Sequence, residues 1–164
     1  MLIRERQNNL PFNFLITMKE AFIMIGCPGS GKSTYVGEKK LPYVSRDQIR
    51  ILLGYCGENE KYLGTREEEK QVTKEHSRIL GEYMSKGLDF FVDDTNVNPK
   101  YRKPLIERLR NSGYTVIGVR VNTSLPVCIG RRPDIPSSVI ENMYKRAQEV
   151  QASEFDNFFE IRGE

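Results

Sequence analysis

The chain has 164 residues, of which 38% are hydrophobic and 29% are charged, and its 25 basic and 22 acidic side chains leave a net charge of +3. These values are typical of one globular domain that is large enough to bury a core. The net charge is too small to indicate nucleic-acid binding by itself, so such a role would depend on where the basic residues lie.

The composition also argues against a membrane protein and a metal cluster. No apolar stretch approaches the roughly 18–20 residues that span a bilayer, and charged and polar residues at positions 4–8 interrupt what a signal peptide would need. Cys27, Cys56 and Cys128 are far apart and lack metal-ligand spacing, as expected of unpaired thiols in a reducing compartment. We therefore expect a cytoplasmic enzyme with no membrane partner.

Residues 1–18 are interpreted as an N-terminal extension of unclear role, and residues 19–164 as a single domain. Met18 directly precedes the first predicted strand, which fits an upstream start codon. In contrast, Phe12, Phe14 and Ile16 argue that part of the extension packs on the domain. Both interpretations stay open, as does the oligomeric state.

A phosphate-binding loop follows the first predicted strand. Residues 26–34 match the pattern G-x-x-x-x-G-K-[ST]. A buried strand over residues 21–25 precedes the loop, and a helix that Gly37 weakens follows from Ser33. The amides of such a loop and the positive end of the next helix bind phosphate oxygens. We expect the nucleotide to bind at Gly26, Gly29, Ser30, Gly31, Lys32, Ser33 and Thr34.

Two residues of this loop have individual expected roles. Lys32 would reach the outer phosphates as a point charge and act in catalysis. The hydroxyl of Ser33 would bind Mg²⁺, a hard cation that prefers oxygen ligands. ATP and Mg²⁺ are therefore the expected cofactors.

An acid and an arginine follow the next extended segment, residues 41–45. Asp47 stands where a helix N-cap would, and a cap needs no catalytic role. However, Arg50 lies three residues further on, on the same side of the helix. Both would project from the carboxyl edge of the sheet, where open α/β sheets bind ligands. We expect Asp47 and Arg50 to act at the site, a role that can coexist with capping.

A long helix is predicted to begin at Thr65, which forms a capping box with Glu68, and to end at Gly87. Its apolar residues recur at helical spacing. His76, the only histidine, lies on this apolar stripe. We predict a partly buried packing residue there rather than a catalytic base.

Asp93 and Asp94 end the next buried strand, residues 88–92. Adjacent residues of a strand point to opposite sides, so one acid should face the site, where related folds place a carboxylate near Mg²⁺. We assign Asp93, with Ser33, to the metal. The alternative is a polar turn into a helix that Asn98 caps and Pro99 begins.

That helix is predicted to run to about Asn111, with a kink or a restart at Pro104. It is rich in basic residues, which usually form a solvated face; contact with nucleic acid is the alternative. Residues 114–121 form the fourth predicted strand. The aromatic residues within 150–164 predict a last segment docked on the sheet.

Arg131 and Arg132 precede a turn that Pro133 and Pro136 stiffen, and a helix follows. We interpret this segment as a cover over the phosphates, where an arginine can stabilise charge on a transferring phosphoryl group. The alternative is a basic pair on the surface.

Three motifs together resemble the kinase domain of bacteriophage polynucleotide kinase-phosphatase. They are the phosphate-binding loop, the segment Ser45-Arg46-Asp47 with Arg50, and the run from Asp94 to Pro99. The order and approximate spacing of the motifs match over about residues 19–148. The loop alone is common to many P-loop enzymes, and the combination is far more specific.

The resemblance implies transfer of the ATP γ-phosphate to the 5′-hydroxyl of DNA or RNA, with the nucleic-acid 5′ end as the partner. It implies that Asp47 accepts the hydroxyl proton, that Arg50 holds the acceptor phosphate with Asp94 orienting it, and that Thr95 lines the acceptor pocket. Arg132, or else Arg131, would contact the nucleotide phosphates.

The chain departs from the family in three respects. The cover is about one residue shorter, Asp93 is an extra acid, and no phosphatase domain is recognisable, so we expect a kinase only. The expected fold is a three-layer α/β P-loop fold, with a parallel sheet in an order near 2-3-1-4, helices on both faces and a small lid. Two other functions stay open: a kinase acting on a small-molecule hydroxyl, and an ATP-binding switch that transfers nothing.

Overall fold

The computed structural model of the protein describes residues 18–57 and 64–163. The expectations for residues 1–17, and for residues 58–63 of the loop before the long helix, lie outside these ranges.

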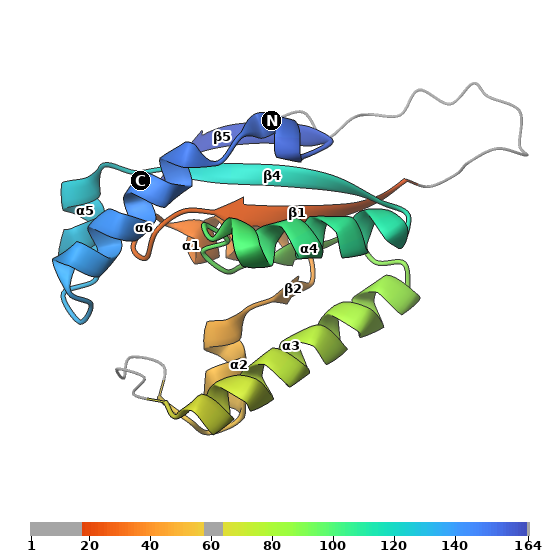
Figure 1. The fold of residues 1–164 in the computed structure, drawn as a ribbon, viewed down its shortest axis with the longest axis horizontal. Helices are drawn as coiled ribbons and strands as arrows, with labels where there is room; N and C mark the ends of the chain where they lie inside the picture. The colour runs from red at the N-terminus through yellow and green to blue at the C-terminus, as the bar shows by residue number, and fades with distance from the viewer. Residues whose placement is uncertain (1–17, 58–63, 164) are drawn as a thin grey trace, which may run out of the picture.

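One parallel sheet in the order β2-β3-β1-β4-β5 organises the described residues (Figure 1). Its strands are β1 (Lys19–Ile25), β2 (Tyr43–Val44), β3 (Phe90–Val92), β4 (Tyr114–Asn122) and β5 (Asn157–Arg162). The central strand β1 pairs with β3 on one side and with β4 on the other. The predicted order 2-3-1-4 is confirmed, and the segment predicted to dock on the sheet is a fifth strand beside β4.

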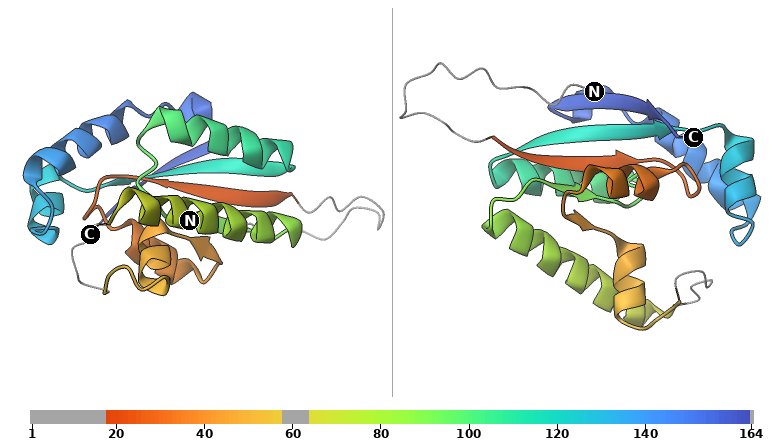
Figure 2. Two further views of the ribbon diagram at one scale, coloured as in Figure 1. Left: turned by 60° about the horizontal axis from the view of Figure 1, so that its bottom comes forward. Right: turned by 180° about the vertical axis from the view of Figure 1, so that it is seen from behind.

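Helices cover both faces of the sheet (Figures 1 and 2). They are α1 (Lys32–Lys39), α2 (Arg46–Leu52), α3 (Arg66–Ser85), α4 (Pro99–Asn111), α5 (Leu125–Arg131) and α6 (Ser137–Glu149), with a 3₁₀ turn over Ala152–Glu154. On one face, α3, α4 and α6 bury apolar residues such as Leu80, Ile106 and Ala147 in a common core. On the other face, Val36 of α1 packs in a second core with Phe91. The predicted three-layer architecture is confirmed.

Several helix ends follow the local chemistry of the sequence. Thr65 and Glu68 form the predicted capping box at the start of α3. Asn98 caps α4, with its side chain accepting a hydrogen bond of 3.0 Å from the amide of Lys100, and Pro99 is the first helical residue. These caps satisfy amides that the first turn of a helix leaves without a backbone partner.

One local prediction is wrong. The N-cap of α2 is Ser45, whose hydroxyl accepts from the amide of Gln48, so Asp47 lies inside the first turn rather than at the cap. In α1, the helix continues past Gly37, its predicted weak point, to Lys39. Pro104 lies inside α4, which stays one helix. Its ring removes one amide donor, and its exposed position adds no buried group without a partner.

The basic residues of α4 mostly bind the protein itself. Arg102 is buried, donates two hydrogen bonds of 2.9 Å to the carboxylate of Glu154, and donates a third to the carbonyl of Asn96. Arg108 donates to Ser77, and Arg110 donates to Asp156. The helix therefore packs through part of its basic set, and Arg102 secures the turn that leaves β3.

No helix within residues 18–57 and 64–163 is both long and apolar enough to cross a membrane.

We expect Arg102→Ala to lower the free energy of unfolding by about 3–5 kcal/mol, because it leaves Glu154 and the Asn96 carbonyl without a buried partner. Urea denaturation would measure the change. Arg108→Ala, which removes a bond to Ser77 at the exposed surface, is the matched control and should cost less than about 1 kcal/mol. Equal losses in the two variants would contradict the structural role of Arg102.

Candidate active site

The phosphate-binding loop folds back on itself between β1 and α1. The amide of Ser30 donates to the carbonyl of Cys27 at 3.3 Å. Gly29 and Gly31 have φ angles of +80° and +98°, which only glycine adopts without strain. A side chain at Gly29 would also place its Cβ 2.5 Å from the carbonyl oxygen of Cys128 in α5. Both glycines are therefore required by the geometry of the loop.

Lys32 is held against this loop. Its ammonium donates to the carbonyls of Gly26 at 3.0 Å and Cys27 at 2.9 Å. Burial lowers the pKa of Lys32, and the negative charge of Asp93 acts in the opposite direction. The carbonyl contacts place the ammonium at the base of the loop.

The two acids after β3 point to opposite sides, as predicted. Asp93 faces the loop and shares a hydrogen bond with the hydroxyl of Ser33. It is only 6% exposed, and among the described residues its Oδ1 atom has no hydrogen-bond partner. Burial raises the pKa of Asp93, although Ser33 and Lys32 act to lower it.

A buried carboxylate oxygen without a partner, beside a hydroxyl, fits a hard cation such as Mg²⁺. Within the described residues no group of three or more His, Cys, Asp or Glu side chains could enclose a metal. This pattern is compatible with Mg²⁺, which proteins often hold by one or two side chains together with phosphates and water.

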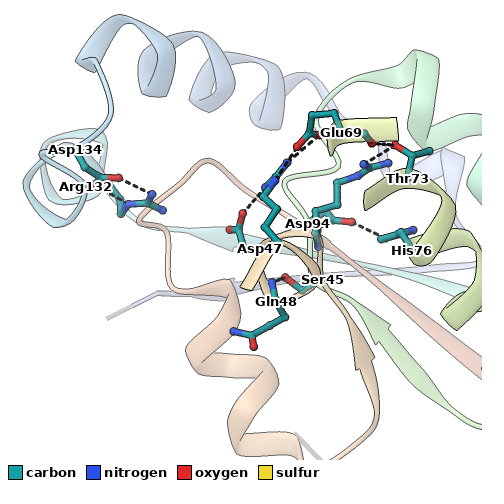
Figure 3. Close-up of polar contacts among 11 residues, drawn as sticks. Ser45, Asp47, Gln48, Glu69, Thr73, His76, Asp94, Arg132 and Asp134 are labelled. Carbon is teal, nitrogen blue, oxygen red and sulfur yellow. Dashed lines mark hydrogen bonds and ion pairs between the residues drawn. The ribbon is translucent and has the colours of Figure 1, made fainter. Parts of the chain in front are cut away.

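Asp94 faces the opposite side, toward α2 and α3. Its Oδ1 accepts a hydrogen bond of 2.9 Å from the amide of Arg46, and its Oδ2 lies 2.8 Å from Nε2 of His76 (Figure 3). Burial raises the pKa of Asp94, but the contacts with His76 and Arg46 outweigh it, so the net shift is downward. The prediction that His76 is partly buried is confirmed, yet its contact is polar rather than apolar packing alone.

Asp47 and Arg50 lie together on α2. An Nη1 atom of Arg50 donates to Oδ1 of Asp47 at 2.6 Å. The same guanidinium donates to both carboxylate oxygens of Glu69 in α3, at 2.9 and 3.2 Å. Arg50 is therefore oriented by an acid on either side, whereas the carboxylate of Asp94 bonds to Arg46 and His76.

The cover consists of α5, the turn after it and α6. Nη1 of Arg131 donates to the carbonyl of Gly29 at 3.3 Å. Arg132 forms a two-bond ion pair with Asp134, at 2.9 and 2.8 Å, which raises its pKa. Arg131 thus already contacts the loop, whereas Arg132 is held by an acid of the cover itself.

These groups meet in one cleft of about 650 Å³, which we call the main cleft. From the predicted set, it is lined by Gly29, Gly31, Lys32, Ser33, Thr34, Asp47, Arg50, Asp93, Asp94, Thr95, Arg131 and Arg132. Gly26 and Ser30 of the loop are buried and do not line the cleft. The amide of Gly26 donates to the carbonyl of Thr95, and the hydroxyl of Thr123 donates to the carbonyl of Ser30 at 2.7 Å.

A second hollow of about 530 Å³ shares Arg131 with the main cleft. Thr123, Tyr144, Gln148 and Gly163 are among the residues that line it. Its lining comes from the ends of β4 and β5, from α5 and from α6.

The sequence did not identify the residues of α3 that take part. Glu69, Thr73 and His76 contact Arg50, Arg46 and Asp94, respectively (Figure 3). Their spacing of four and three residues puts them on one face of the helix. That periodicity was visible, but it does not reveal which neighbour the face meets.

Both buried thiols lie under this site. Cys27 and Cys128 are unpaired and buried. Burial, with a hydrogen bond that the Cys27 thiol donates to Cys128, raises the pKa of Cys27 to about 12. A thiol of so high a pKa is a poor nucleophile, which argues against reactivity in the loop.

Comparison with known proteins agrees with this architecture. A family model described as an AAA domain matches residues 22–150. A chain of the Pnkp1/Rnl/Hen1 RNA repair complex is similar, with a TM-score of 0.69 at 19% identity over 80% of this chain and 45% of that one. The chain thus spans about half the length of that protein.

Two further solved structures are similar over most of the chain. A chain of the PezAT chromosomal toxin–antitoxin system of Streptococcus pneumoniae gives a TM-score of 0.63 at 16% identity, over 88% of this chain and 68% of that one. The APS kinase CysC of Mycobacterium tuberculosis gives 0.53 at 18% identity, over 87% and 88%. With residues 22–150 matched by the family model and the sheet of P-loop kinases in place, the chain belongs to the AAA domain family and has the P-loop kinase fold.

Proposed function

We propose that the protein is a kinase that transfers the γ-phosphate of ATP to the 5′-hydroxyl of DNA or RNA, and that residues 19–164 act as one kinase domain. The observation that carries the proposal is the main cleft, which brings the phosphate-binding loop and the Asp47–Arg50 pair together. A protein that only binds ATP has no use for an acid and an arginine opposite the phosphates.

The loop side of the main cleft would hold ATP. Amides of the loop and the ammonium of Lys32 would bind the phosphate oxygens. The second hollow, which shares Arg131, would take the nucleoside. Arg131 or Arg132 would then contact the phosphates and stabilise the charge on the transferring group. For Arg132 this requires exchange of Asp134 for a phosphate, which binds guanidinium groups with the same two-bond geometry.

Ser33 and Asp93 would hold Mg²⁺. The cation would supply neutralisation of charge on the outer phosphates. Asp93 would provide the Oδ1 atom that has no partner among the described residues, and Ser33 would provide its hydroxyl.

The α2 side would hold the acceptor. Asp47 would accept the proton of the 5′-hydroxyl while the hydroxyl oxygen bonds to the γ-phosphorus and the bond to the β-phosphate oxygen breaks, releasing ADP. Arg50 would bind the phosphate next to the acceptor sugar, because a guanidinium suits phosphate recognition. Thr95 would line this pocket, and Asp94 would orient the protein residues that bind the acceptor.

Two observations support a polynucleotide acceptor and one supports a smaller one. The motif set of the sequence and the similarity to a chain of an RNA repair complex favour the 5′ end of a nucleic acid. The similarity to an APS kinase over 88% of that chain favours a small-molecule hydroxyl as the second candidate.

The unpaired thiols fit a reducing compartment such as the cytoplasm.

We expect labelled phosphate to pass from ATP, with Mg²⁺, to oligonucleotides that carry a 5′-hydroxyl. The same oligonucleotides with a 5′-phosphate are the control and should take no label. Activity should fall as the salt concentration rises, because contacts with acceptor phosphates are screened. Transfer to small hydroxyl compounds but to no oligonucleotide would replace the proposal with its second candidate.

We expect Asp47→Asn to lower kcat by about 10²–10⁴-fold, the usual contribution of a general base, without changing the affinity for an ATP analogue. Steady-state transfer and calorimetry would measure the two quantities. Glu67→Gln is the matched control, because the side chains of Glu67 and Asp47 are both 77% exposed. Normal transfer by Asp47→Asn would show that another group accepts the proton.

We expect Asp93→Asn to raise the melting temperature in metal-free buffer at neutral pH and to abolish the effect of Mg²⁺ on affinity for ATP. The raised pKa of Asp93 means that its ionised form is disfavoured in the folded protein. The resulting loss in the free energy of unfolding is absent below the ordinary pKa of an aspartate, grows as the pH rises toward the raised pKa, and persists above it. The stability gain should therefore disappear in acid; a gain that is equal at all pH values would contradict this assignment.

A further inference from the structure

A polar face of α3 meets the acceptor side of the main cleft. Its members are Glu69, Thr73 and His76, which we call the α3 polar stripe. Positions separated by four and then three residues lie on the same side of a helix. Each member makes a hydrogen bond to a residue that lines the main cleft.

The first two contacts are made to arginines of α2. Glu69 accepts two hydrogen bonds from Arg50. The hydroxyl of Thr73 accepts from Nη1 of Arg46 at 3.0 Å and donates to the carbonyl of Glu69 at 2.9 Å. Thr73 thereby uses its hydroxyl as donor and acceptor at once.

The third contact reaches α2 through β3. His76 holds one oxygen of Asp94, and the other oxygen accepts from the amide of Arg46, the first residue of α2. Asp94 therefore caps α2 from the segment that follows β3, in addition to the cap by Ser45, which directly precedes the helix. A carboxylate at this position satisfies an amide that the helix cannot pair and complements its positive end.

These contacts matter because α2 buries little apolar surface of its own. It is seven residues long, and Ile49 is its only buried residue. A helix this short is not stable by itself. The orientation of Asp47 and Arg50 therefore depends on polar contacts with α3.

We propose that the α3 polar stripe positions the acceptor-binding residues of α2. In this proposal Asp94, held by His76, acts by capping α2 and does not contact the acceptor. The proposal rests on the proposed function, since it assigns the acceptor to Asp47 and Arg50. In these terms Glu69, His76 and Asp94 are positioning residues.

The test compares kinetics and local exchange in purified variants. Glu69→Gln and His76→Leu should lower kcat/KM for the 5′-hydroxyl oligonucleotide by about 100-fold, the scale of a misplaced catalytic group. Their affinity for an ATP analogue should stay within about twofold of the wild type, because the loop keeps its contacts. Arg78→Ala, which removes only surface ion pairs of α3 with Glu75 and Glu82, is the matched control and should change neither quantity.

Conservative variants separate a cap from a direct ligand. Asn at position 94 keeps an oxygen for the amide of Arg46, so Asp94→Asn should retain most activity, whereas Asp94→Ala should lose it. Likewise His76→Gln keeps a polar partner for Asp94 and should rescue activity relative to His76→Leu. Equal loss in Asp94→Asn and Asp94→Ala would overturn the capping role.

Amide hydrogen exchange of α2 gives a readout that needs no activity. Exchange should rise in His76→Leu and in Asp94→Ala, and stay unchanged in Arg78→Ala. Unchanged exchange in the first two variants, or activity within twofold of the wild type, would overturn the proposal. If the wild type phosphorylates no acceptor, the proposed function fails, and exchange of α2 still decides whether the stripe holds this helix.

Discussion

The alternation of side chains at the end of β3 divides the main cleft into two halves. Adjacent residues of a strand point to opposite sides, so Asp93 turns to Ser33 of the phosphate-binding loop and Asp94 turns to α2 and α3. Neither carboxylate could serve both sides. The strand thus places one buried acid beside the proposed metal site and the next acid in the chain beside α2, in a different environment.

The two halves are held by different forces. The loop side follows from backbone geometry, since glycines at positive φ and the close approach of α5 to Gly29 leave the loop little freedom. The α2 side depends on charged hydrogen bonds, because Ile49 is the only buried residue of this seven-residue helix and cannot fix its orientation alone. Contacts between ionised groups are stronger than neutral ones and fix direction as well as distance. In our proposal, the positioning of Asp47 and Arg50 is therefore sensitive to single changes on α3.

The cover completes the cleft and differs between its two arginines. Arg131 already contacts the loop through Gly29, whereas Arg132 is paired with Asp134. An ion pair with two parallel bonds can be exchanged for one with phosphate at little net cost, since both partners are anions of similar geometry. Arg50, which lies between the carboxylates of Asp47 and Glu69, could likewise exchange a carboxylate partner for a phosphate.

The sequence by itself determined whatever depends on neighbours along the chain. Four features involve residues only a few positions apart: the phosphate-binding loop, the strand before it, the capping box of Thr65 with Glu68, and the cap at Asn98. Sequence pattern and local hydrogen-bonding chemistry were therefore sufficient to predict them. Tertiary structure decided the partners. Arg50 and Glu69 are 19 residues apart and meet because α3 packs beside α2, whereas His76 and Asp94 are 18 residues apart and meet because α3 also lies beside the end of β3. Periodicity identifies which face of a helix a residue occupies, but the element that this face meets is set by packing of the whole core.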